Sequence, residues 1–131
     1  MSTVTLELDD IYKLAHDVML ANGCDSDNAA ALADIICRAE RDGSHSHGLF
    51  RVPGYVKALR SGKVDGKAKP TVKHVTPAVI QIDGNGCFAP LAQAVSLPLL
   101  ADATGKIGIA ALSLVGIHHF AALWPETEYL A

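Results

Sequence analysis

The sequence predicts a protein of mixed helices and strands, with helices in the first 62 residues and a small sheet with further helices after them. Three observations support this. Apolar residues recur at three- and four-residue intervals through residues 8–62. Two short runs rich in β-branched residues flank Thr76-Pro77 and end at the turn sequence Asp83-Gly84-Asn85-Gly86. Residues 107–115 form a short apolar run, as in a strand buried on both faces.

The N-terminal part begins with a short predicted strand over residues 3–6 and a helix over residues 8–21. Asn22-Gly23 ends this helix, because glycine suits the left-handed position after a helix. Asp25 or Ser26 caps the next helix, which runs to about Arg41. The two helices are expected to form a hairpin. The predicted buried positions are Ile11, Leu14, Ala15 and Val18 in the first helix and Ala29, Leu32, Ala33 and Ile36 in the second.

A polar loop over residues 42–48 separates these helices from a third, which starts near Phe50 so that Pro53 falls in its first turn. Gly62 closes the third helix. Residues 63–70 are polar and without period, which indicates a connection. We therefore expect a helical part over residues 1–62 and an α/β part over residues 63–131.

The second part contains predicted strands over residues 72–75 and 78–82, followed by a helix that begins near Phe88 and ends at Gly105. Pro98 should kink that helix or start a new turn. The apolar run over residues 107–115 is the third strand. Residues 121–131 begin another helix, with Trp124 and Pro125 in its first turn.

The composition is that of a folded domain. The 131 residues are 50% hydrophobic and 19% charged, and 11 Lys+Arg against 14 Asp+Glu give a net charge of −3. This mild acidity argues against a nucleic-acid or membrane-surface role. Apolar stretches are too short to span a bilayer, and no signal peptide is recognised, so we expect the cytoplasm. The odd set Cys24, Cys37 and Cys87 has no CxxC pair, which predicts reduced, mostly buried thiols.

Four of the six histidines fall in two clusters, His45 with His47 and His118 with His119. A histidine in a loop can act as a general acid or base near neutral pH, and an arginine such as Arg51 can hold a carboxylate with two hydrogen bonds. Two other interpretations stay open on spacing alone. The histidines and Arg51 can be ordinary surface and strand-end residues, or His45 and His47 can bind a metal together with His118 or His119.

Several of these segments together resemble one family, the malate/L-lactate dehydrogenase type-2 family, which includes ureidoglycolate dehydrogenase, sulfolactate dehydrogenase and piperideine-2-carboxylate reductase. The resemblance extends over essentially the whole chain. It is most specific in the string Ser46-His47-Gly48-x-x-Arg51-x-Pro53-x-Tyr55. The other matching stretches are Asp42-Gly43-Ser44-His45, Gly62-Lys63-Val64, Ile82-Asp83-Gly84-Asn85-Gly86 and His118-His119-Phe120.

The resemblance implies a non-Rossmann α+β fold with a mostly antiparallel sheet, which binds NAD or NADP and usually forms a homodimer. It implies that His47 is a catalytic histidine with Ser46 beside it, that Arg51 binds the substrate carboxylate, and that His119 is the second catalytic histidine. Ala121 stands where the family has glycine after its His-Phe pair. It leaves His45 and His118 without a functional role and implies no metal.

Family members are more than twice as long as this chain, and the resemblance implies that most of the cofactor-binding segment lies beyond residue 131. The chain is therefore expected to be the N-terminal part of an oxidoreductase that transfers hydride between NAD(P) and a small 2-oxo or 2-hydroxy acid or a cyclic 2-imino acid. The alternatives are an inactive fragment that folds and self-associates, and a histidine-rich metal-binding protein.

Overall fold

The structure is a computed structural model that describes residues 4–118 and 122–131. The described helices are α1 (Leu8–Ala21), α2 (Ser26–Arg41), α3 (Val52–Arg60), α4 (Ala89–Ile107) and α5 (Trp124–Leu130). Two short 3-10 helices, η1 (His45–His47) and η2 (Leu49–Arg51), connect α2 to α3. The described strands are β1 (Thr71–Thr76), β2 (Val79–Asp83) and β3 (Ala111–Val115).

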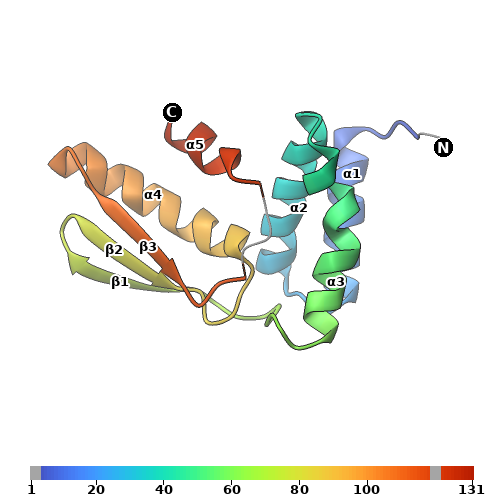
Figure 1. Cartoon of the computed structure of the whole chain (residues 1–131), viewed down its shortest axis with the longest axis horizontal. Coiled ribbons are helices and arrows are strands. Elements are labelled where there is room, and N and C mark those ends of the chain that lie inside the picture. The colour runs from blue at the N-terminus through green and yellow to red at the C-terminus, as the bar shows by residue number, and fades with distance from the viewer. Residues whose placement is uncertain (1–3, 119–121) are drawn as a thin grey trace.

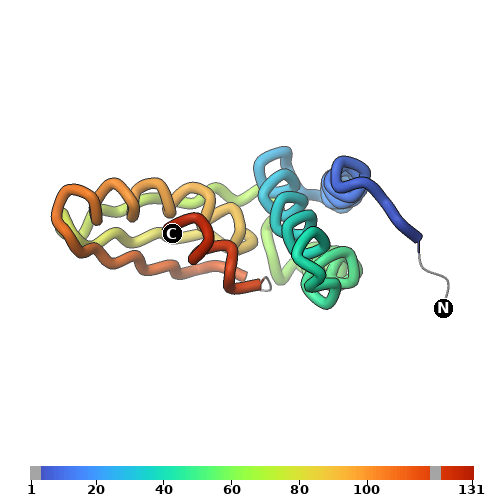
Figure 2. The backbone as a smooth tube through the Cα atoms, turned by 90° about the horizontal axis from the view of Figure 1, so that it is seen from above, coloured from blue at the N-terminus to red at the C-terminus, as the bar shows by residue number. Residues whose placement is uncertain are grey.

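Helices α1, α2 and α3 form a bundle at one end of the molecule, and α4 lies along the sheet at the other (Figures 1 and 2). The predicted bounds of α1 and the predicted end of α2 are confirmed. All four predicted buried residues of α2 are fully buried. In α1 the buried row is Ile11, Ala15 and Met19, whereas Leu14 is 48% exposed, so its predicted burial is wrong. Tyr12 and Val18 pack partly buried beside this row, and Leu14 lies outside the contact of α1 with the bundle.

Asp25 caps α2, as expected, by accepting a hydrogen bond from the Asn28 amide at 2.9 Å. Burial alone would raise the pKa of Asp25, but hydrogen bonds from Lys69 and Asn28 outweigh it and lower the pKa to about 2. The predicted strand over residues 3–6 is wrong for its described residues, because residues 4–7 are irregular and exposed and pair with no described strand. Thr3 lies outside the described residues.

The three strands lie in the order β1-β2-β3, with β1 antiparallel to β2 and β2 parallel to β3. The α+β class is confirmed, and the described sheet is mixed. Helix α4 makes the crossover between the parallel strands and covers one face of the sheet, where Ile80 and Ile82 are buried (Figure 1). The expected burial of residues 107–115 on both faces is wrong. β3 alternates exposed and half-buried residues because only the α4 side is covered.

Helix α4 is longer than predicted. It passes through Gly105 and ends at Gly108, whose φ of +90° is the left-handed conformation that favours glycine. The prediction that Gly105 ends the helix is therefore wrong. Pro98 lies inside α4, which continues on both sides of it.

Two buried clusters hold these layers together. One fills the bundle, and the other lies between α4 and the sheet. All three cysteines are free thiols, with Cys24 and Cys87 buried and Cys37 partly so, as predicted. Within residues 4–118 and 122–131, no helix is long and apolar enough to cross a membrane.

Candidate active site

The segment between α2 and α3 is shaped by one carboxylate, that of Glu40 in the last turn of α2. Its Oε1 accepts a hydrogen bond from the Leu49 amide at 2.7 Å, and its Oε2 contacts His45 Nδ1 at 2.5 Å. The Glu40 side chain is only 14% exposed. A Cβ on Gly48 would lie 2.1 Å from Glu40 Oε1, so this loop closes over the carboxylate only with glycine there. Residues 45–51 are thus anchored to the end of a rigid helix.

His47 is half-buried in this segment and lies against two serine hydroxyls. Its Nδ1 is 3.3 Å from Ser44 Oγ and 3.0 Å from Ser46 Oγ. A hydroxyl can donate to a neutral imidazole nitrogen or accept from a protonated one. The two serines can therefore satisfy Nδ1 in either protonation state of His47. This arrangement leaves Nε2 as the nitrogen through which His47 can exchange a proton with a bound molecule.

Arg51 is bound to the same segment through Ser46. Its Nε donates to the Ser46 carbonyl at 2.9 Å, while the Ser46 hydroxyl contacts His47. Ser46 therefore connects His47 and Arg51, and the structure brings these three predicted site residues together. Burial raises the pKa of the neighbouring Tyr55 hydroxyl to about 12, with the Arg51 charge opposing this, so Tyr55 stays neutral at physiological pH.

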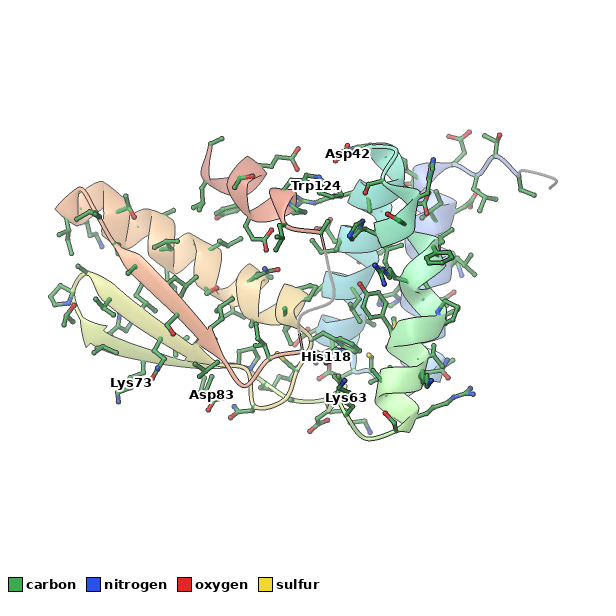
Figure 3. All side chains as sticks on the ribbon, in the orientation of Figure 1. Asp42, Lys63, Lys73, Asp83, His118 and Trp124 are labelled. Atoms are coloured by element: carbon green, nitrogen blue, oxygen red, sulfur yellow. The ribbon has the colours of Figure 1, made fainter. Side chains whose placement is uncertain are left out.

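The side chain of Trp124, at the start of α5, lies against His47. The two rings are 6.1 Å apart at an interplanar angle of 80°, an edge-to-face contact. Trp124 Nε1 also donates to Asp42 Oδ2 at 3.0 Å. Figure 3 shows Trp124 extending from α5 toward Asp42 at the C-terminal end of α2. A residue 77 positions further along the chain thus completes the surroundings of His47.

His118 is not part of this group. It lies beside Lys63 near the C-terminal end of α3, away from Asp42 and Trp124 (Figure 3). Its backbone pairs with Phe88, and its ring makes an edge contact with the Phe88 ring at 5.9 Å. With Lys57, Ser61 and Lys63 it lines a shallow cavity of about 170 Å³. The interpretation of His118 as a structural strand-end residue agrees with these contacts.

The predicted second catalytic histidine, His119, lies outside the described residues, as do Phe120 and Ala121. Its role stays a prediction. Among the described residues, no group of three or more His, Cys, Asp or Glu side chains is arranged to hold a metal ion.

The glycine-rich turn after β2 does not fit a nucleotide cofactor. All its backbone amides are used within the protein: Gly84 donates to Val115, Gly86 to Gly116, Asn85 to the Asp83 side chain and Cys87 to Gly84. A phosphate-binding loop needs free amides that converge on the anion. This turn is therefore not a phosphate-binding loop.

Two residues of this site were not identified from the sequence. Glu40 reads as one more polar residue of an amphipathic helix, and only its buried carboxylate reveals its role. Trp124 was placed in the first turn of a helix but not near the histidines, because sequence spacing gives no contact between residues 47 and 124. Its one available signal is that it is the only tryptophan in the chain.

Comparison with known proteins identifies close relatives of this chain. The family model described as malate/L-lactate dehydrogenase matches residues 6–131. The chain is 44% identical over 125 residues to the Δ1-pyrroline-2-carboxylate reductase of Ancylobacter novellus, covering 95% of this chain and 37% of the relative.

Solved structures show the same fold. The Δ1-piperideine-2-carboxylate reductase from Pseudomonas syringae pv. tomato is 43% identical with a TM-score of 0.93, over 96% of this chain and 38% of that one. The sulfolactate dehydrogenase from Methanocaldococcus jannaschii is 25% identical with a TM-score of 0.87, over 95% of this chain and 36% of that one. The chain thus spans less than two fifths of the length of the relatives it matches.

Proposed function

Because the chain belongs to the malate/L-lactate dehydrogenase family, we propose that it is the N-terminal part of an oxidoreductase that transfers hydride between a nicotinamide cofactor and a small carboxylate substrate. The proposed substrates are 2-oxo or 2-hydroxy acids and cyclic 2-imino acids. The last class is supported by the names of several relatives that are 43–44% identical to this chain, which are pyrroline- and piperideine-2-carboxylate reductases.

One observation carries the proposal. His47 and Arg51 are bonded to the same residue, Ser46, through its hydroxyl and its carbonyl respectively. A 2-oxo or 2-imino acid has its carboxylate one bond from the carbon that is reduced. An enzyme for such substrates needs a cation for the carboxylate and an acid for the adjacent oxygen or nitrogen, held at a fixed separation.

The residues of this chain would divide the chemistry in the following way. Arg51 binds the substrate carboxylate and thereby orients the reacting carbon. Protonated His47 gives its Nε2 proton to the oxygen or imine nitrogen as negative charge develops there. The other ring proton stays on Nδ1, where the Ser44 and Ser46 hydroxyl oxygens accept its hydrogen bond and hold the ring in place. When bound, the cofactor would supply the hydride.

A hybrid protein tests this proposal. Residues 1–131 replace the matching N-terminal part of the Pseudomonas syringae pv. tomato reductase, with which they share 43% identity. We expect the hybrid to oxidise NADH or NADPH with a cyclic 2-imino acid. His47→Gln should lower kcat/KM by about 10²- to 10⁴-fold. Arg51→Lys should raise KM for the carboxylate substrate, because lysine cannot form the bidentate contact.

His74→Gln is the matched control, since His74 is an exposed residue of β1 that does not line the cavity at His118. It should leave kcat/KM unchanged. A hybrid that unfolds cooperatively at the temperature of the parent enzyme and yet shows no turnover contradicts the proposal. So does a His47→Gln hybrid with full activity.

The non-catalytic alternative is favoured by one feature, the exposure of large apolar side chains such as Phe50, Ile109 and Leu123, which are 76%, 77% and 69% exposed. A fragment that only self-associates through such residues gains no stability from nucleotide. An increase in Tm of the 131-residue chain with NADH or NADPH therefore favours the enzymatic proposal.

A further inference from the structure

The chain's single tryptophan is held against the histidine to which we assign proton transfer. Trp124 makes the edge-to-face contact with His47, and its indole N–H is bonded to Asp42. His47 belongs to η1, Asp42 is the C-cap of α2, and Trp124 begins α5. Three separate elements therefore meet at this contact.

We propose that Trp124 is a positioning residue for His47. Its indole ring contacts the imidazole, while Ser44 and Ser46 contact the imidazole at Nδ1. This inference rests on the proposed role of His47 in catalysis. The contact itself is a property of the folded chain and does not depend on turnover.

Trp124 is itself anchored at two points. Asp42, its hydrogen-bond acceptor, is held by two bonds from Arg41, Nε to Oδ1 at 2.7 Å and Nη2 to Oδ2 at 3.0 Å. One turn further along α5, Glu128 accepts from Arg41 at 3.1 Å and lies 3.5 Å from Arg38. Helix α5 is thus tied to α2 at both the tryptophan and the next turn. The indole consequently has a defined place relative to His47.

An aromatic ring beside an imidazole affects the two protonation states differently. A proton added to the imidazole changes its electrostatic interaction with the π system of the neighbouring ring. An ordered ring also restricts rotation of the histidine side chain, which keeps its proton aimed in one direction. A structural role in holding α5 would produce neither effect.

Several charged groups lie on the elements around this contact, and the ion pairs of Arg38 and Arg41 with Glu128 connect α2 to α5. The hydrogen bond from Arg41, and then that from Trp124, hold the pKa of Asp42 below its usual value, so Asp42 stays ionised through the range in which histidines titrate. The charged or titratable groups concerned are Arg38, Glu40, Arg41, Asp42, His45, Arg51, Glu126 and Glu128.

Tryptophan fluorescence tests the proposal directly, because the chain has one tryptophan and an imidazolium in contact with indole quenches its emission. The 131-residue chain is titrated between about pH 5 and pH 8, without substrate or cofactor. We expect the emission to fall as the pH decreases, in one step. His47→Gln should abolish the step, whereas His45→Gln, the matched histidine two residues away, should keep it.

The consequence for catalysis is measured in the hybrid reductase. Trp124→Phe keeps a ring but loses the bond to Asp42, and Trp124→Ala loses both. We expect kcat to fall about tenfold or more in Trp124→Ala with little change in KM, and Trp124→Phe to recover part of the loss. Equal loss in both variants, or a loss confined to KM, would contradict positioning of the proton donor.

Two fluorescence results overturn the inference: emission that does not change between pH 5 and pH 8, and a step that persists in His47→Gln. If a histidine variant fails to fold, NMR of the histidine ring protons is measured instead. Trp124→Leu should then shift the ring-proton signals of His47 and leave those of His74 unchanged. An inactive hybrid with a normal fluorescence step would reject the proposed function and leave the Trp124–His47 contact in place.

Discussion

At the scale of single residues, the site is organised by Ser46 and Glu40. Ser46 connects His47 to Arg51, and Glu40 holds the backbone at Leu49. The Ser-His-Gly-x-x-Arg string predicted Ser46, His47 and Arg51 as site residues, but not the hydrogen bonds through which Ser46 connects the other two. The role of Glu40 could not be predicted. No sequence feature distinguishes a buried carboxylate that holds a loop from a solvent-exposed one at the end of an amphipathic helix.

Gly48→Ala tests the role of Glu40. An added Cβ would meet Glu40 Oε1 at 2.1 Å, so the carboxylate must move and give up its bond to the Leu49 amide. We expect the free energy of unfolding to fall by about 1–3 kcal/mol. Chemical denaturation in urea measures this change.

Gly54→Ala is the matched control, because Gly54 lies in α3 and a Cβ there meets nothing within 4 Å. It should raise stability by about 0.4–1 kcal/mol, because alanine loses less entropy than glycine on entering a helix. Equal changes in the free energy of unfolding for the two substitutions would mean that the Glu40 carboxylate does not require glycine at position 48.

At the scale of elements, sequence patterns located helices better than they located helix ends and strand environments. The predicted bounds of α1 and the cap at Asp25 are confirmed. Asn22-Gly23 marks the end of α1, and Asp25 marks the start of α2. The end of α4 was misplaced by three residues, since Gly105 and Gly108 are equally plausible stops. β3 was expected to be covered on both faces. An apolar run shows that a segment is hydrophobic on average. How much of β3 is buried depends instead on α4, which covers only one face of the sheet.

Substitution of the two glycines at the end of α4 by alanine should change the free energy of unfolding in opposite directions. Gly105 is inside the helix with open space at its Cβ, whereas Gly108 has a φ of +90°. Gly105→Ala should raise the free energy of unfolding by about 0.5–1 kcal/mol, and Gly108→Ala should lower it by about 1–2 kcal/mol. Thermal unfolding of both variants under identical conditions gives the comparison. Stabilisation by Gly108→Ala would contradict the left-handed conformation of Gly108 at the end of α4.

At the scale of the whole molecule, two adjacent residues connect the two buried clusters. Cys87 is fully buried in the cluster under α4, whereas Phe88 packs edge-on against Tyr55, with ring centroids 5.4 Å apart, in the core of the helical bundle. Phe88 has an extended backbone, so its side chain leaves the chain on the other side from that of Cys87. The bundle and the sheet layer share this dipeptide.

Phe88→Ala should therefore destabilise the whole molecule. Its ring is 1% exposed, and removing such a side chain costs about 3–5 kcal/mol. We expect hydrogen exchange to accelerate in both the bundle and the sheet layer. Phe50→Ala is the matched control, because Phe50 is 76% exposed and should change stability by no more than about 0.5 kcal/mol. Faster exchange confined to the bundle would show that the two layers are stabilised independently.

The parallel pairing of β2 and β3 also bears on how quickly the chain reaches its structure. Two parallel strands cannot be joined by a tight turn, so β3 can pair only after α4 has returned the chain to the start of β2. The hairpin of α1 and α2 depends on contacts between neighbours in sequence and carries no such delay. During synthesis the bundle also emerges first. The order of assembly thus follows the order of the sequence, and the last strand to join is the one from which the segment containing His118 leaves the sheet.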